Sequence, residues 1–294
     1  KFNDNFSNNI KKELSYELTS DQTNALNEIN NDLKSEEKMF RLLQGDVGSG
    51  KTIIALISCF NVVNSGYQVA FMAPTEILAY QHYKLAQSLI KGKIKIGFLT
   101  SKTDYGERKK IIKDLENGEI KILFGTHSVF QEKINYKKLG LVVIDEQHKF
   151  GVKQRMSLAN KGGKNCDVLL MSATPIPRTM MLTIYGDMDV SRLTEKPKSR
   201  LPILTYSKPE KKIDDLIEII KKNLAQNNQV FWVCPLIKES QILDYSSVKM
   251  RFEWLKKKFP NETSILHGEL KQNEKDLVLE KFLKKKTKLL VSTT

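Results

Sequence analysis

The chain has 294 residues, enough for about two domains, and 40% of them are hydrophobic, enough for a sizeable core. Its formal net charge of +14 indicates either a lysine-rich solvated surface or a polyanionic partner such as nucleic acid. The three cysteines are isolated from one another, which excludes a disulfide scaffold. No apolar run approaches the roughly 20 residues that a membrane helix needs, which excludes a membrane-spanning protein.

The first 195 residues alternate short apolar runs with longer amphipathic stretches. This alternation predicts βαβ units and a parallel sheet with helices on both faces. The predicted strands are Phe40–Gln44, Gln68–Ala73, Ile94–Leu99, Ile120–Phe124, Leu139–Ile144, Asp167–Met171 and Asp189–Leu193. The predicted helices between them are Thr52–Asn64, Glu76–Lys91 and Tyr105–Asn117.

A proline-rich, charged segment at 196–206 then predicts a linker, because proline restricts its own backbone and that of the residue before it. Beyond it the alternation restarts. The predicted elements there are helix Ile213–Gln226, strand Val230–Cys234, helix Ser247–Lys258, strand Ser264–Leu266, helix Lys271–Leu283 and strand Lys288–Ser292. We therefore expect a residual segment at 1–17, a first α/β domain at 18–195 and an incomplete second α/β domain at 207–294. The missing initiator Met and the apolar strand at the end predict a piece of a longer protein.

The stretch Gly45 to Thr52 reads GDVGSGKT and fits the phosphate-loop pattern G-x-x-x-x-G-K-[ST] between a strand and a helix. Its glycines allow a tight turn whose N–H groups point at phosphates, and the helix adds a positive dipole end. Lys51 is expected to reach the β- and γ-phosphates, and the Thr52 hydroxyl to ligate Mg²⁺. The predicted nucleotide-binding residues are Gly45, Asp46, Val47, Gly48, Ser49, Gly50, Lys51 and Thr52, with ATP and Mg²⁺ as cofactors.

An acid pair, Asp145 and Glu146, follows the fully apolar run Leu141–Ile144. Such a run is typical of a central parallel strand, and its carboxyl end beside the phosphate loop is where Mg²⁺ must be held. We assign Asp145 to Mg²⁺, through water, and Glu146 to the base that activates the attacking water. The alternative is a solvated turn without chemistry. Lys51, Asp145 and Glu146 are the predicted catalytic residues.

These motifs resemble those of superfamily 2 helicases. Asp145–His148 is similar to the DExH box, and Met171–Pro175 to motif III, a Ser-Ala-Thr sequence. Ala73–Glu76 resembles motif Ia, Gly125–His127 a further DNA-contact motif, and Leu266–Gly268 a motif of the second domain. The resemblance implies two RecA-like P-loop domains, with ATP bound in the first and facing the cleft between them.

A narrower resemblance is to the RecG family of branch-migration helicases, from about Leu18 onward. It rests on the stretches 44–52, 73–79, 145–152, 173–179, 185–191 and 232–237. Ser49 and Gln147 favour this family over the related transcription-repair coupling translocases, which stay the alternative. The resemblance implies an ATP-dependent motor for stalled forks and Holliday junctions, monomeric and in the bacterial cytoplasm.

The departures from the family pattern are modest within the motifs. Lys149 stands where the family usually has arginine, and residues 128–130 read Ser-Val-Phe. The family's motif VI, whose arginines contact the γ-phosphate, is absent from this sequence. A nucleotide- and DNA-binding module without turnover is therefore a second hypothesis, and an RNA helicase is a third.

The resemblance also assigns roles to single residues. Gln22 is expected to read the adenine edge with its amide, although Thr19 or Ser20 equally indicates an ordinary helix start. Ser172 and Thr174 are implied to couple hydrolysis to domain motion, and the alternative is that they are plain strand-end hydroxyls. His148 is implied to take part in the same coupling, with a structural role as its alternative. The implied DNA-binding residues are Pro74, Thr75, Glu76, Thr126, His127, Arg178, His267 and Gly268, with a plain surface arginine as the alternative for Arg178. The spacing of the histidines excludes a zinc site.

Overall fold

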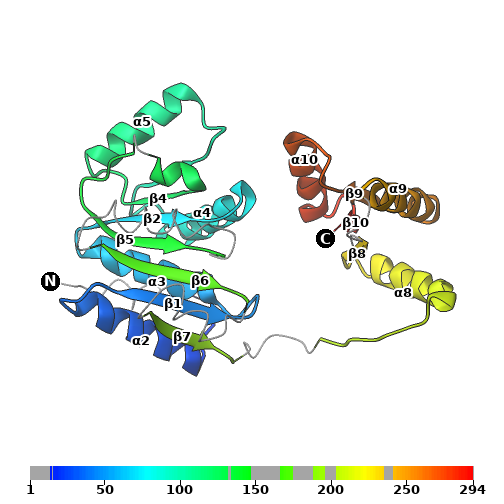
Figure 1. The fold of residues 1–294 in the computed structure, drawn as a ribbon, viewed down its shortest axis with the longest axis horizontal. Coiled ribbons are helices and arrows are strands. Elements are labelled where there is room, and N and C mark those ends of the chain that lie inside the picture. Colours follow the sequence, from blue (N-terminus) through cyan, green and yellow to red (C-terminus); the bar gives the residue numbers. More distant parts are fainter. Residues whose placement is uncertain are drawn as a thin grey trace. The chain divides into compact units, whose positions relative to one another are not determined.

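The computed structural model of the chain describes residues 14, 16–131, 134–146, 166–174, 188–195, 203–234 and 241–293. It divides into two compact units, Lys1–Leu201 and Pro202–Thr294, and this boundary falls inside the predicted linker at 196–206. Each unit is an α/β body (Figure 1). His148 and Arg178, both expected in the functional site, lie outside the described residues.

The first unit contains a seven-stranded sheet in the order β3-β4-β2-β5-β6-β1-β7, in which every neighbouring pair runs parallel. Its strands are β1 Phe40–Gly45, β2 Gln68–Met72, β3 Ile96–Leu99, β4 Ile122–Gly125, β5 Leu139–Ile144, β6 Asp167–Ser172 and β7 Asp189–Leu193. All seven predicted strands are present. β3 and β4 begin later than predicted, since their ladder starts only at the pair Ile96 and Ile122.

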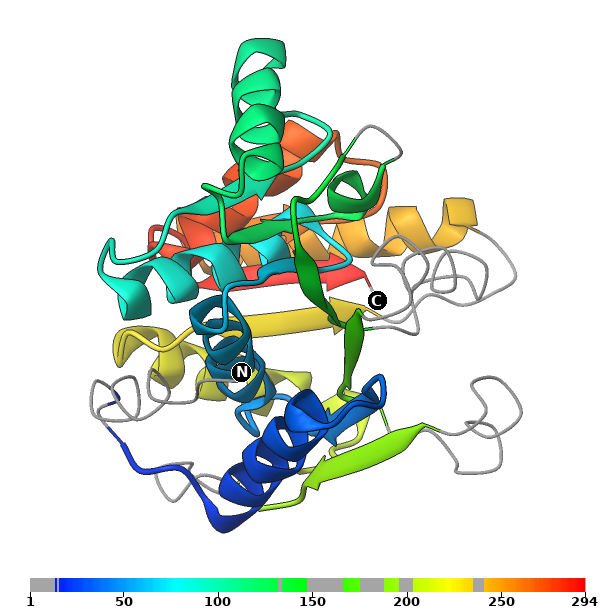
Figure 2. The ribbon, with the colours of Figure 1, turned by 90° about the vertical axis from the view of Figure 1, so that its left-hand side faces the viewer.

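Helices cover both faces of this sheet, as Figures 1 and 2 show. The described helices are α2 Ser20–Lys34, α3 Lys51–Asn64, α4 Glu76–Ile90, α5 Tyr105–Glu116 and the 3-10 helix η1 His127–Phe130. Side chains alternate across each strand, so Phe71 and Val143 pack on the face with α2, α3 and α4, whereas Ala70 and Val142 pack on the face with α5 and η1. The phosphate-loop helix α3 is buried along nearly its whole length.

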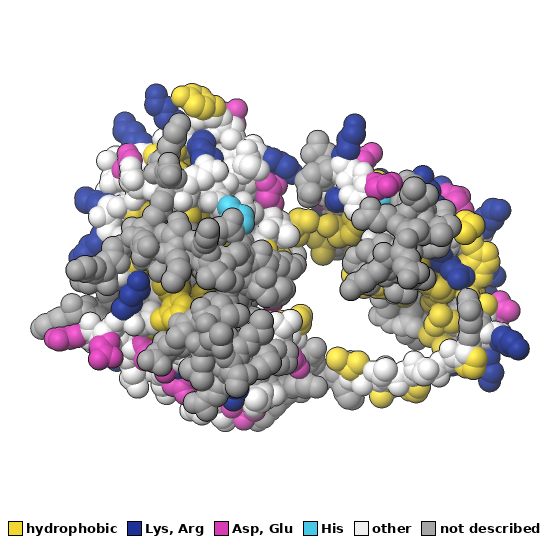
Figure 3. Space-filling model, in the orientation of Figure 1, with side chains coloured by type: hydrophobic (Ala, Val, Ile, Leu, Met, Phe, Trp, Pro, Cys, Tyr) yellow, Lys and Arg dark blue, Asp and Glu magenta, His cyan; other side chains and the backbone are white. Residues whose placement is uncertain are grey.

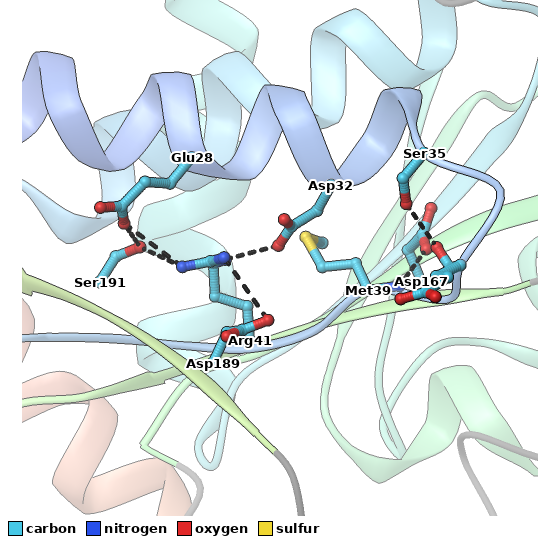
Figure 4. A network of polar contacts seen from close by, with 9 residues as sticks. Glu28, Asp32, Ser35, Met39, Arg41, Asp167, Asp189 and Ser191 are labelled. Atoms are coloured by element: carbon cyan, nitrogen blue, oxygen red, sulfur yellow. Dashed lines mark hydrogen bonds and ion pairs between the residues drawn. The ribbon is translucent and has the colours of Figure 1, made fainter.

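An arginine ties α2 to two strands (Figure 4). Arg41 of β1 is 8% exposed, and its guanidinium binds Asp32 at 2.6 Å and Glu28 at 3.3 Å, both on α2. It also reaches Asp189 at 3.6 Å and the Ser191 hydroxyl at 3.0 Å, both on β7. A buried guanidinium requires such partners, because an unpaired buried charge is strongly disfavoured.

The start of α2 is also attached to the end of β7. One carboxylate oxygen of Asp21 accepts hydrogen bonds from the Thr194 N–H at 2.7 Å, the Thr194 hydroxyl at 2.6 Å and the Glu195 N–H at 2.9 Å. These bonds lower the pKa of Asp21 below its ordinary value, with the Thr194 hydroxyl as the largest cause. The segment that carries Gln22 is thereby fixed to the residues just before the predicted linker.

The second unit contains a parallel sheet of three described strands in the order β8-β10-β9. Its elements are η3 Glu210–Lys212, α8 Ile213–Ala225, β8 Val230–Cys234, α9 Gln241–Lys258, β9 Thr263–Leu266, α10 Gln272–Leu283 and β10 Leu289–Thr293. Its core joins α8 and α9 to the sheet through residues such as Ile220, Leu255 and Val291. The prediction started α9 too late, at Ser247. The pair Ser246-Ser247 interrupts the apolar periodicity, yet the backbone is helical from Gln241 onward.

Two features predicted from composition can be compared with the described part of the chain. No helix there is long and apolar enough to cross a membrane. Figure 3 shows basic side chains interspersed with acidic ones over the visible face rather than gathered into a single patch.

Candidate functional site

The phosphate loop joins β1 to α3, and its glycines have the backbone conformation that only glycine adopts easily. Gly48 and Gly50 have φ angles of 82° and 92°. A side chain on Gly50 would collide with the amide of Gln22, so this position is limited by space as well as by its dihedral angle. Because Gly50 caps α3 without a side chain, the helix presents its first N–H groups and its positive dipole end at the loop.

Gln22 lies beneath this loop and is only 2% exposed. Its side-chain amide donates to the Ser49 carbonyl at 2.7 Å, and its side-chain oxygen accepts from the Thr19 N–H at 3.0 Å. Thr19 in turn caps α2 and accepts from the Gln22 N–H, which confirms the interpretation of this segment as a helix start. The adenine contact of Gln22 stays a prediction. Sequence reasoning missed that this glutamine supports the phosphate loop itself.

The amine of Lys51 lies against the loop that precedes it. It donates to the carbonyl oxygens of Gly45 at 2.6 Å and Asp46 at 3.1 Å. Burial lowers the pKa of Lys51, while the charges of Glu146, Asp145 and Asp46 act to raise it. The acid pair is therefore close enough for its charges to act on the lysine ammonium.

The remaining loop residues fit a phosphate ligand. The Ser49 side chain is buried, and its hydroxyl has no hydrogen-bond partner among the described residues, which is unusual for a buried polar atom. Asp46, Val47 and Gly48 are exposed at the loop tip, with Val47 at 74%, and Thr52 lies partly buried in the first turn of α3. An orphan hydroxyl, a buried amine and an open helix N-terminus suit the oxygens of a nucleotide phosphate.

The acid pair follows β5 as predicted. Asp145 is 7% exposed, and its N–H donates to the Met72 carbonyl of β2 at 2.9 Å. Glu146 is partly buried and has a φ of 49°, a left-handed conformation that is uncommon for a residue with a side chain. Such positions occur at functional sites more often than elsewhere.

Two details of this region were not foreseen. β6 lies between β1 and β5, so the strand bearing the acids is not the direct neighbour of the strand bearing the phosphate loop. In addition, His82 of α4 contacts Asp145, with 2.8 Å between His82 Nε2 and Asp145 Oδ2. No spacing rule places a histidine in mid-helix beside an acid 63 residues away, so only the tertiary structure shows the pair.

The intervening strand β6 ends in the predicted coupling residues. Ser172 is fully buried, and its hydroxyl lies 3.0 Å from that of Thr174 and accepts from the Thr174 N–H at 3.2 Å. The Gln44 side chain of β1 donates to the Thr174 carbonyl at 3.2 Å. The turn after β6 is therefore bonded to the strand that enters the phosphate loop, whereas its coupling role stays a prediction.

The predicted DNA-contact residues of the first unit lie along the same sheet edge. β2 and β4 are neighbours, and beyond their ladder the Ala73 N–H donates to the Gly125 carbonyl at 3.0 Å. This brings the partly buried Pro74 and exposed Thr75 next to the partly buried Thr126 and exposed His127. The carboxyl ends of adjacent parallel strands thus unite two segments that are far apart in the sequence.

Glu76, predicted in the same group, is already engaged by neighbours. Its carboxylate accepts from the Ser101 hydroxyl at 3.3 Å and pairs with the Lys102 ammonium at 3.0 Å. Lys102 follows β3, so the pair joins the end of that strand to the start of α4. The positive charge of Lys102 offsets an acid that would otherwise repel a nucleic-acid phosphate.

In the second unit, His267 and Gly268 follow β9. His267 is 7% exposed, and burial lowers its pKa, whereas Gly268 is exposed and its carbonyl accepts from Lys275 at 2.7 Å. The predicted DNA-contact motif therefore presents backbone rather than an open imidazole. No group of three or more His, Cys, Asp or Glu in the described part of the chain has the arrangement of a metal site. An Mg²⁺ ion at the phosphate loop would therefore depend on phosphate oxygens and water for most of its ligands.

Comparison with known proteins identifies two matching families. The DEAD/DEAH box helicase model matches residues 19–182, and the helicase conserved C-terminal domain model matches residues 211–294. The chain is 45% identical over 286 residues to the ATP-dependent DNA helicase RecG of Thermotoga maritima, covering 96% of the chain and 36% of that relative. It is 44% identical over 286 residues to the RecG of Bacillus subtilis, covering 96% of the chain and 42% of that relative.

Solved structures give the same result. A structure of RecG bound to a three-way DNA junction matches with a TM-score of 0.84 and 39% identity, over 100% of this chain and 38% of the other. A yeast Dbp5 structure with RNA matches with a TM-score of 0.68 at 20% identity, which shows the fold alone. The chain spans about two fifths of the length of the curated relatives that it matches.

Proposed function

Because the chain belongs to the DEAD/DEAH box helicase family, we propose that it is the motor part of an ATP-dependent DNA helicase that remodels branched DNA. Its two units are RecA-like helicase domains, the second with a small sheet. The observation that carries the proposal is that the phosphate loop after β1 and the acid pair after β5 lie at the same edge of one parallel sheet, where the charges of the acids act on the Lys51 ammonium. One triphosphate held by the phosphate loop would therefore also face the acid pair.

The loop residues bind and orient the nucleotide. Phosphate oxygens would replace the carbonyls of Gly45 and Asp46 as partners of the Lys51 amine, and the open N–H groups of α3 would face the same oxygens. The unpartnered Ser49 hydroxyl is a further donor at this place. In this proposal the Gln22 amide supports the Ser49 backbone and contacts adenine.

The strand-end residues carry the hydrolysis. Thr52 and Asp145 would hold Mg²⁺, which would neutralise the charge of the phosphates. Glu146, at the sharp left-handed turn after β5, would orient and deprotonate the attacking water. Ser172 and Thr174 would couple ATP hydrolysis to movement of the neighbouring domain through the hydrogen-bonded turn after β6.

The sheet edge formed by Thr75, Thr126 and His127 would contact the DNA backbone. Hydroxyls and N–H groups at helix starts are common phosphate partners, and they carry no sequence preference. At the same edge Lys102 offsets the negative charge of Glu76. Branched DNA as substrate is supported by the RecG relatives and by the RecG structure with a three-way junction. We place this monomeric motor in the bacterial cytoplasm, since the named RecG relatives are bacterial.

The function is tested by two substitutions in the full-length protein. Lys51→Ala is expected to abolish nucleotide binding, because it removes the one side-chain cation of the loop. Glu146→Gln is expected to keep binding but to lower the rate of ATP turnover by at least about 10²-fold, the usual contribution of a general base. Binding is measured by fluorescence of a labelled nucleotide and turnover by phosphate release. Unchanged turnover in Glu146→Gln would refute the assigned base.

The nucleic-acid substrate is tested in the same assay. Branched DNA is expected to stimulate ATP turnover more than linear duplex DNA or RNA of equal length. Stimulation by RNA alone would instead assign an RNA helicase. A chain that binds nucleotide and DNA without turnover, even when extended to the length of its relatives, would reduce the assignment to a binding module.

A further inference from the structure

A buried hydrogen bond joins α4 to the acid pair. His82 Nε2 and Asp145 Oδ2 lie 2.8 Å apart, and the two side chains are only 9% and 10% exposed. A carboxylate only accepts hydrogen bonds, so Nε2 carries the proton and donates it. The bond therefore occupies one carboxylate oxygen of Asp145 and leaves Oδ1 for another partner.

The imidazole is itself held in place. Its ring packs on Phe71 of β2 with 5.0 Å between ring centroids, and Phe71 stacks on Phe124 of β4 at 5.1 Å. The helix that carries His82 begins at the Thr75 cap, at the sheet edge described above. The donor to Asp145 is thus fixed by the helix, by an aromatic contact and by burial.

We propose that His82 is a positioning residue for the metal-holding acid, a role that rests on the proposed function of Asp145. By fixing Oδ2, it selects one orientation of the carboxylate and directs Oδ1 toward the Mg²⁺ of the bound nucleotide. Carboxylates that hold metals are commonly oriented by such outer partners, whose removal weakens metal affinity by about 10–100-fold. The histidine touches neither nucleotide nor metal in this assignment.

The test compares His82→Gln with His82→Met in the full-length protein. Both residues are unbranched and of similar length, but only glutamine has an N–H group that can replace Nε2. The probe is a fluorescent, non-hydrolysable ATP analogue titrated at increasing Mg²⁺ concentration and in EDTA. We expect His82→Met to raise the half-saturating Mg²⁺ concentration about tenfold or more and to leave binding in EDTA unchanged. In His82→Gln, the half-saturating Mg²⁺ concentration should stay within about threefold of that of the parent protein.

Tyr83→Leu is the matched control, because Tyr83 lies on the same helix and packs on Phe98 and Phe124. It should leave the Mg²⁺ requirement unchanged. Equal shifts in the glutamine and methionine variants, or none in either, would overturn the positioning role. Asp145→Asn distinguishes a failure of the His82 positioning role from a failure of the proposed function of Asp145. If that variant has the parent's Mg²⁺ requirement, Asp145 is not the metal acid; if it loses Mg²⁺ dependence, the histidine variants decide.

Discussion

Asp167 is an acid whose placement disfavours its charge. Burial raises its pKa to about 6, although the Met39 N–H, 2.9 Å from its Oδ1, acts in the opposite direction. Because the folded pKa lies above the unfolded one, the folded state binds the proton more tightly. This contribution to stability is fully present below about pH 4, near the ordinary pKa of 3.8, and is lost as the pH rises through about 6.

Asp167→Asn should therefore stabilise the first unit at neutral pH. The asparagine side chain keeps an acceptor for the Met39 N–H and removes the buried charge. We expect a gain of about 1 kcal/mol at pH 8, discounted for partial solvent screening, that shrinks toward pH 5. Urea unfolding at the two pH values measures it. A gain that is equal at both values would show that the charge is not the cause.

At the scale of elements, the Arg41 cluster determines how α2 is attached. The Arg41 guanidinium bonds carboxylates of both α2 and β7. At the start of α2, Asp21 accepts hydrogen bonds from Thr194 and Glu195, just after β7. The helix that supports the phosphate loop through Gln22 is thus held at both the sheet and the chain segment before the linker.

Arg41→Met should loosen this attachment. It removes the guanidinium and leaves the acids of α2 and β7 facing one another, so we expect about 2 kcal/mol less stability of the first unit and weaker nucleotide binding. Denaturant unfolding and labelled-nucleotide binding measure the two effects. Lys95→Met is the control, because Lys95 pairs with Asp114 and Glu119 at an exposed site, where little change is expected. Equal losses in both variants would contradict the account.

At the scale of the whole molecule, the described residues of the proposed nucleotide site all belong to the first unit. The phosphate loop, the acid pair, Gln22 and the turn after β6 lie within Lys1–Leu201, whose hydrophobic core is distinct from that of the second unit. In the proposed function, nucleotide binding is therefore a property of one unit, whereas movement along DNA needs both.

Residues 1–201 expressed alone should bind labelled ADP with an affinity within about threefold of the full chain, since each described unit has its own core. The same piece should show no DNA-stimulated turnover. Lys51→Ala in this piece is the control for specific binding. Binding that appears only when 202–294 is present would show that the second unit completes the nucleotide site.

The sequence alone determined the local features of this protein. A strand, a glycine loop and a helix of the right lengths follow from residue types at 40–64, and a buried strand that ends in two acids follows from an apolar run at 141–144. The same reasoning predicted that Lys51, Asp145 and Glu146 act as one chemical group, because the carboxyl ends of parallel strands share an edge.

Only the tertiary structure decided the order of the strands and the partners of buried polar groups. It placed β6 between β1 and β5, His82 on Asp145, Gln22 under Ser49 and Arg41 among three acids. The physical reason is that periodicity and motif spacing report contacts along one element. A buried donor or charge instead takes whichever partner packing brings within hydrogen-bond distance, however far away that partner lies in the sequence.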